Sequence, residues 1–101
     1  MTKVTLDKKA AALIGFAIKS GNAVFGADNI DKKPKTALVL FSGVSDNTRK
    51  RLEFFCGKHG TALYETNEPI EEVAHKNNCK VIGFLEGPLT EALKDRIIEV
   101  N

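Results

Sequence analysis

The run TALVLF at residues 36–41 constrains this chain most, because five of its six residues are apolar and no polar residue alternates with them. A strand with one solvated face alternates apolar and polar side chains, whereas a nearly continuous apolar run is typical of a strand buried on both faces. Such a strand needs a layer of helices above it and another below it. We therefore expect a layered α/β fold built around residues 36–41.

Apolar residues at helical spacing predict helices at residues 5–20, 45–59, 68–77 and 87–100. Thr5 or Asp7 is expected to cap the first of these helices, Ser45 the second and Asn67 the third, and Gly60 follows the second. Segment 27–32 is predicted to be at most a stunted helix, because Pro34 ends it. Strands are expected at AVF (23–25), TALVLF (36–41), TALYE (61–65) and CKVIGFL (79–85).

The regular alternation of these elements predicts a three-layer α/β/α sandwich, with a parallel or mixed sheet between the helices. The 101 residues predict a single domain, residues 1–101. A hydrophobic fraction of 43% and a charged fraction of 28% are ordinary for a soluble protein, and no apolar run approaches the roughly 20 residues of a membrane span. We expect a cytoplasmic protein without membrane attachment.

Chemically reactive groups are sparse and scattered. Cys56 and Cys79 lack a second pair with which to form a zinc site, so we expect two buried free thiols and neither metal nor cofactor. Glu65 and Glu86 follow two predicted strands and are candidates for a carboxylate pair, although two solvated carboxylates are the simpler interpretation. We expect a protein that is not an enzyme, with an unrecognised enzyme using Glu65 or Glu86 as an alternative.

The stretch SGNAVFGADNIDKKPKTALVLF, residues 20–41, has two glycines ahead of a polar run. A dinucleotide fingerprint needs a strand before its glycines and a helix directly after, and a phosphate loop ends in Gly-Lys-Ser/Thr, so Gly21 and Gly26 fit neither motif. Three lysines, Lys32, Lys33 and Lys35, follow the second glycine. With a net charge of only +2, these lysines permit an anionic partner without requiring one.

Three segments resemble one protein family: LIGFAIKSGNAVFG, ALVLFSGVSDNTRKRLEFFCGKHG and VIGFLEGPLTEAL. They are similar to the ribosomal-protein superfamily of L-seven-Ae and L-thirty-e, and most of all to its short bacterial members. The family has an Asn-Thr followed by lysines, with a cysteine nine positions after the asparagine. The matching residues here are Asn47, Thr48, Arg49, Lys50, Arg51, Leu52 and Cys56.

The resemblance implies a four-stranded mixed sheet between helices, no catalysis and, as in many relatives, binding to structured RNA of the kink-turn type. It implies that Gly26 lets the backbone approach RNA, that Asp28 and Asn29 take the base-reading positions, and that Lys32 contacts nucleic acid. Lys33 and Lys35 extend the same edge. The loop after the last strand is expected to flank the RNA, with Glu86, Gly87 and Pro88.

The sequence departs from the family pattern at three points. Asn22 replaces the lysine of the family's Ala-Gly-Lys turn, Asp28 places a carboxylate where phosphates approach, and Pro34 shortens the helix that carries the reading residues. A protein-interaction module on the same fold, with a surface around Phe25 in contact with a partner, is therefore a second hypothesis.

Overall fold

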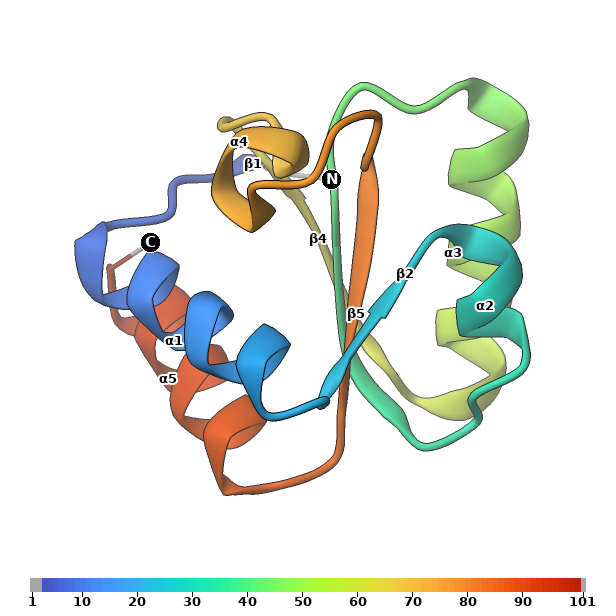
Figure 1. The fold of residues 1–101 in the computed structure, drawn as a ribbon. Helices are drawn as coiled ribbons and strands as arrows, with labels where there is room; N and C mark the ends of the chain where they lie inside the picture. The colour runs from blue at the N-terminus through green and yellow to red at the C-terminus, as the bar shows by residue number, and fades with distance from the viewer. Residues whose placement is uncertain (1–2, 101) are drawn as a thin grey trace.

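The computed structural model describes residues 3–100, which fold into a five-stranded mixed sheet between two layers of helices (Figure 1). Helices α1, α4 and α5 lie on one side of the sheet, and α2 and α3 lie on the other. In chain order the elements are β1 Lys3–Val4, α1 Lys8–Lys19, β2 Ala23–Phe25, α2 Ala27–Asp31, β3 Thr36–Phe41, α3 Asp46–His59, β4 Ala62–Thr66, α4 Ile70–Ala74, β5 Val81–Leu85 and α5 Pro88–Val100.

The sheet has the strand order β1-β4-β3-β5-β2, so β3 is its central strand, as the TALVLF run predicts. The expected α/β class is confirmed, but the expected count of four strands is wrong. The fifth strand is β1, where Lys3 and Val4 pair in parallel with Glu65 and Thr66 of β4. Two residues are too few to show an alternating pattern in the sequence, which is why this strand escaped prediction.

Strand β3 is buried on both of its faces. Leu38 and Leu40 pack into the hydrophobic cluster under α1, α4 and α5, whereas Val39 and Phe41 pack into the cluster under α2 and α3. All four side chains are fully buried. Because complete burial of such a side chain contributes about 1.5–3 kcal/mol, this strand anchors both layers of the fold.

The helix boundaries follow local capping chemistry. The Asp7 side chain accepts a hydrogen bond from the backbone N–H of Ala10, and Gly60 ends α3 in the left-handed conformation. Helix α2 is a single short turn, as expected from Pro34. Helix α4 is shorter than expected, and Asn67 does not cap it: Pro69 is the residue before its first turn.

The strand directions create two distinct ends of the sheet. Strands β3 and β4 are parallel, and β5 runs antiparallel to both β3 and β2. Phe41 therefore pairs with Val81 at one end, and Thr36 pairs with Leu85 at the other. We call these the Gly26 end and the Glu86 end, after the residues that follow β2 and β5. None of the helices within residues 3–100 has the length and apolar character needed to cross a membrane.

Candidate nucleic-acid interface

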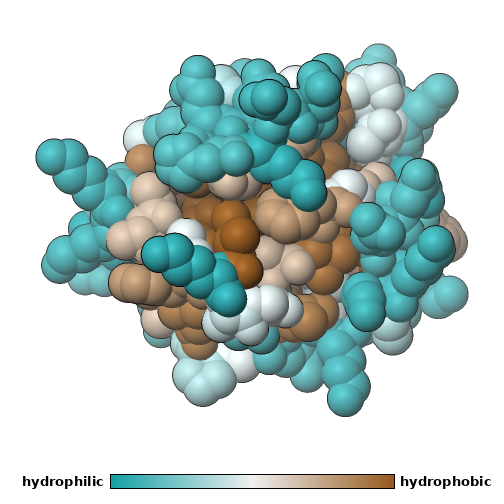
Figure 2. Space-filling view, viewed as in Figure 1, coloured by the Kyte–Doolittle hydropathy of each residue, from teal (hydrophilic) through white to brown (hydrophobic). Residues whose placement is uncertain are grey.

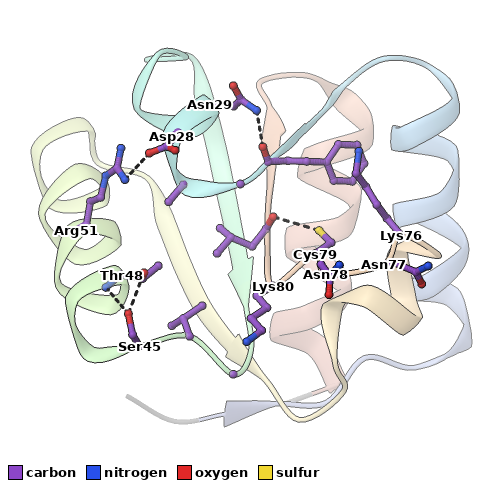
Figure 3. A pocket seen from close by; sticks show the side chains of 16 residues that line it. Asp28, Asn29, Ser45, Thr48, Arg51, Lys76, Asn77, Asn78, Cys79 and Lys80 are labelled. Atoms are coloured by element: carbon purple, nitrogen blue, oxygen red, sulfur yellow. Dashed lines mark hydrogen bonds and ion pairs between the residues drawn. The ribbon is translucent and has the colours of Figure 1, made fainter.

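An open cavity of about 660 Å³ lies at the Gly26 end of the sheet (Figure 3). Three stretches of the chain that are distant in sequence form its wall, the second of which comprises both a loop and the helix that follows it. They are the turn from β2 into α2, the loop from β3 into α3 with the first turns of α3, and the loop between α4 and β5. The lining residues are Phe25, Gly26, Ala27, Asp28, Asn29, Gly43, Val44, Ser45, Thr48, Arg51, Lys76, Asn77, Asn78, Cys79, Lys80 and Val81.

The turn at Gly26 brings backbone to the edge of the cavity. Gly26 has φ 86° and ψ 148°, a conformation that residues with a Cβ rarely adopt. Its N–H donates to the carbonyl of Val81 at 3.0 Å, which ties the turn to the first residue of β5. The Asn29 side chain donates from Nδ2 to the Phe25 carbonyl at 2.8 Å, so its amide closes the turn.

The loop from β3 into α3 forms the facing wall. Gly43, with φ 68°, turns the chain out of the sheet, and Ser45 begins the 14-residue helix α3. The Ser45 hydroxyl accepts from the Thr48 N–H at 3.2 Å and donates to the Thr48 hydroxyl at 3.1 Å. The positive end of the helix dipole consequently lies beside the cavity, where it favours negative charge.

The loop of residues 76–80 supplies most of the positive charge, and we call it the KNNCK loop. Two hydrogen bonds to Glu71 fix this loop. The Glu71 backbone carbonyl accepts from the Lys76 N–H at 3.0 Å, and its carboxylate accepts from the Asn78 N–H at 3.0 Å. The ammonium of Lys76 lies 4.2 Å from the centre of the Phe25 ring. Within residues 3–100, no carboxylate lies within ion-pair distance of Lys76 or Lys80.

Arg51 carries the other cation at the cavity, and two carboxylates engage it. Its Nη1 lies 2.6 Å from Oδ1 of Asp28, and its Nε donates to Oδ2 of Asp31, also at 2.6 Å. These hydrogen bonds to Asp28 and Asp31 raise the pKa of the guanidinium. The carboxylate of Asp28, which would otherwise repel an anion, is thereby partly neutralised.

These features combine into a surface that suits a phosphate-bearing ligand. A glycine turn without a Cβ permits close approach to the backbone, a helix N-terminus favours negative charge, and Lys76 and Lys80 offer ammonium groups. Among the described residues no group of three His, Cys, Asp or Glu side chains is arranged to hold a metal ion.

The structure divides the predicted site residues between the two ends of the sheet. Gly26, Asp28 and Asn29 line the cavity. The other six do not line it: Lys32, Lys33, Lys35, Glu86, Gly87 and Pro88.

The loop after the last strand, which was predicted to flank the RNA, lies at the end of the sheet opposite the Gly26 turn. The Glu86 N–H donates to the Lys35 carbonyl at 3.0 Å, at the Glu86 end. Five residue steps of β3, about 17 Å at the usual rise, separate the two ends. The physical reason is that β5 runs antiparallel to β2, which brings the start of β5, and not its end, to the Gly26 turn. Asn22, whose carbonyl accepts from the Leu85 N–H at 2.9 Å, also lies at the Glu86 end.

Sequence reasoning missed the KNNCK loop and the α3 N-terminus as parts of the site. Lys76 shortly precedes the predicted strand 79–85 and Lys80 is its second residue, and these two lysines were the available signal. Only the antiparallel direction of β5 shows that they face Gly26.

The candidate carboxylate pair does not form. Glu65 lies at the Gly26 end, where its carboxylate pairs with Arg49 at 3.2 Å. Glu86 lies at the opposite end, next to Lys35. Because β4 and β5 run in opposite directions, the ends of these two strands do not meet.

Comparison with solved structures places this fold among known proteins. The chain is similar to a protein with unknown function from Bacillus halodurans C, with a TM-score of 0.81 and 20% identity, over 91% of this chain and 99% of that one. It is also similar to the Giardia lamblia 15.5kD RNA binding protein, with a TM-score of 0.68 and 11% identity, over 94% and 92% of the two chains. No family model matches the sequence, and no curated protein matches it at a significant level. At these identities the likeness establishes a shared fold.

Proposed function

We propose that this protein binds structured RNA through the cavity at the Gly26 end. The observation that carries the proposal is the convergence of a glycine turn, the α3 N-terminus and the KNNCK loop on one open cavity. Each of the three is suited to a phosphodiester backbone, and only the fold brings them together. The Giardia neighbour, described as RNA binding, has the same fold and supports the assignment.

The finer proposal is a ribosome-related, cytoplasmic protein that recognises an RNA of the kink-turn type and has neither catalytic activity nor a cofactor. The family resemblance of the Gly26 turn and the Asn47–Cys56 helix supports it. Asp28 does not stand as an isolated negative charge within the site, because Arg51 is bound to it.

A protein partner is the second candidate function, and one observation favours it. Hydrophobic side chains gather in the middle of the face that carries β2 (Figure 2), and Ala23 and Phe25 of this strand are only half-buried. The ammonium of Lys76 lies over the Phe25 ring, so this apolar surface has a cation at its border.

The deciding experiment measures affinity for a kink-turn duplex and for a control duplex in which the tandem sheared G·A pairs are replaced. We expect tight binding to the first and weaker binding to the second. Equal affinity for both would remove kink-turn specificity while leaving RNA binding, and absence of binding to either would favour the protein partner.

Single variants then locate the surface. Lys76→Ala and Lys80→Ala should each weaken binding and reduce the salt slope by about one unit, because each removes one phosphate contact. Lys9→Ala, an exposed lysine of α1 that does not line the cavity, is the matched control. Lys32→Ala and Lys33→Ala test whether the surface extends past α2. Loss of affinity in these two variants alone would move the site to the C-terminal side of α2.

A further inference from the structure

The outer face of α3 carries an unusually exposed aromatic side chain. Phe54 is 74% exposed, against 59% for Phe16, 62% for Ile98 and 45% for Val100, the other exposed large hydrophobic residues among those described. Its neighbour Phe55, by contrast, is buried in the core under α2 and α3. Phe54 therefore makes little contribution to the fold and leaves most of its ring available to a ligand.

Basic residues flank the Phe54 ring along the helix. Residues three and four positions apart are neighbours on a helix surface, which places Lys50, Arg51 and Lys58 beside Phe54. Gly57, also a neighbour at this spacing, adds no side chain, so one flank of the ring stays open. Lys50 and Lys58 are exposed, and neither forms an ion pair within residues 3–100.

A second cleft, of about 210 Å³, opens next to the Phe54 ring. Its lining residues are Asp31, Arg51, Phe54, Phe55, Lys58 and His59. The Phe55 and His59 rings contact each other there, with their centres 4.6 Å apart. The cleft thus offers aromatic surface bordered by Lys58 and by the Arg51–Asp31 ion pair.

Arg51 connects this cleft to the cavity at the Gly26 end, because its side chain lines both. A ligand that occupies the first cavity and continues past Arg51 reaches Phe54 without leaving the surface of α3. The two sites therefore adjoin at Arg51, with the first at the N-terminal turns of α3 and the second along its C-terminal half.

We infer that Phe54 is a stacking platform for an unpaired nucleotide next to the structured part of the bound RNA, with Lys50 and Lys58 in contact with its phosphates. This inference rests on the proposed function and adds a single-stranded flank to the RNA that the protein takes. Aromatic rings beside a track of cations are the usual means of holding single-stranded nucleic acid, since every base has a face that stacks. The unpaired ammonium groups of Lys50 and Lys58 favour this polyanion over an apolar peptide.

The test compares a blunt kink-turn duplex with the same duplex carrying a short single-stranded adenosine extension, on either strand in turn. A 2-aminopurine in the extension reports stacking by loss of its fluorescence. We expect the extension on one strand to tighten binding on the order of tenfold, as for one stacked base. Phe54→Ala should abolish this gain and the fluorescence change, and should leave affinity for the blunt duplex unchanged.

Further substitutions separate stacking from simple hydrophobic contact. Phe54→Trp should keep the gain, Phe54→Leu should lose it, and Phe16→Ala on α1 is the matched exposed control. Retention of the gain by Phe54→Leu, or no gain from an extension on either strand, would overturn the inference.

Failure of the proposed function has a different signature, because the blunt duplex would then not bind at all. In that case free oligoadenylate is the probe: Phe54-dependent loss of fluorescence supports the platform, and its absence overturns it. If the face instead binds a protein partner, the chain should bind neither RNA. That partner should then bind Phe54→Leu as tightly as it binds the unchanged chain.

Discussion

Arg51 of α3 is bound to Asp28 of α2 with Nη1 and Oδ1 2.6 Å apart, so the carboxylate that enters the cavity is paired with a cation from the neighbouring helix (Figure 3). The side chain of Asp28 is 84% exposed, which leaves its second oxygen open to solvent. The pair joins the helix that carries the glycine turn to the helix whose N-terminus lines the same cavity.

The first prediction concerns this pair. Asp28→Asn removes a negative charge from the cavity and releases Arg51 from one of its two partners, so RNA should bind more tightly, by on the order of 1 kcal/mol as for one added contact. The measurement is the dissociation constant for the kink-turn duplex at several salt concentrations. Asp95→Asn, which makes the same charge change on an exposed residue of α5, is the control. Weaker binding by Asp28→Asn would show that the carboxylate itself contacts the ligand.

The second prediction concerns Glu71, which positions the KNNCK loop without lining the cavity. Glu71→Ala removes the carboxylate that accepts from the Asn78 N–H, so the loop should loosen and RNA affinity should fall several-fold. Glu71→Gln keeps an acceptor oxygen and should bind nearly as well as the unchanged chain. Glu72→Ala removes the same charge from the adjacent exposed residue and is the control. Equal effects of the Glu71→Ala and Glu72→Ala variants would mean that only charge matters.

The core of the fold could be predicted because its signals are local. The TALVLF run has the composition of a strand covered on both faces, and Ser45 and Gly60 mark the ends of α3 through their own side-chain and backbone chemistry. Strand β1 could not be predicted in this way. Lys3 and Val4 are strand residues because β4 lies beside them, and nothing in two residues encodes that neighbour.

The site was only half predictable for a related reason. Gly26 and Asp28 stand in a motif that can be recognised along the chain, but the direction of β5 is a property of the whole sheet. Without that direction, the loop after β5 and the loop before it are equally good candidates to face Gly26. The structure selects the loop before β5, which brings Lys76 and Lys80 to the cavity and leaves Glu86 at the other end.

The third prediction compares two glycines for their effect on stability. A Cβ on Gly83 would lie 3.0 Å from Cγ2 of Thr36 and 3.1 Å from Cγ1 of Ile30, both buried residues. Gly83→Ala should therefore lower the free energy of unfolding by about 1–3 kcal/mol through overpacking. A Cβ on Gly15 meets nothing within 4 Å, so Gly15→Ala in the interior of α1 should raise it by about 0.5–1 kcal/mol. Urea denaturation measures both, and a stabilised Gly83→Ala variant would contradict the packing described between β5 and α2.

The last prediction concerns Cys56 of α3, which is buried in the hydrophobic cluster between α2, α3 and the sheet, as its helical phase predicts. Burial raises the pKa of this thiol from its ordinary value of 9.0 to about 11. The native protein should therefore react slowly with a thiol reagent, and faster only when unfolded.

The same shift in pKa gives stability a pH dependence. Below pH 9.0 the thiol is neutral in both the folded and the unfolded chain, so its contribution to stability is fully present. Between pH 9.0 and about 11 the unfolded chain ionises while the folded chain does not, and this contribution is lost as pH rises. Cys56→Ala removes that dependence and should cost about 1 kcal/mol at neutral pH, the usual scale for a core substitution. Urea denaturation gives the free energy of unfolding of both proteins across this pH range. The difference between the two values removes the contribution of lysine and tyrosine titration, which both proteins share. The stability gap between them should narrow as pH rises through the window, and a gap that stays constant would place the Cys56 thiol in contact with water.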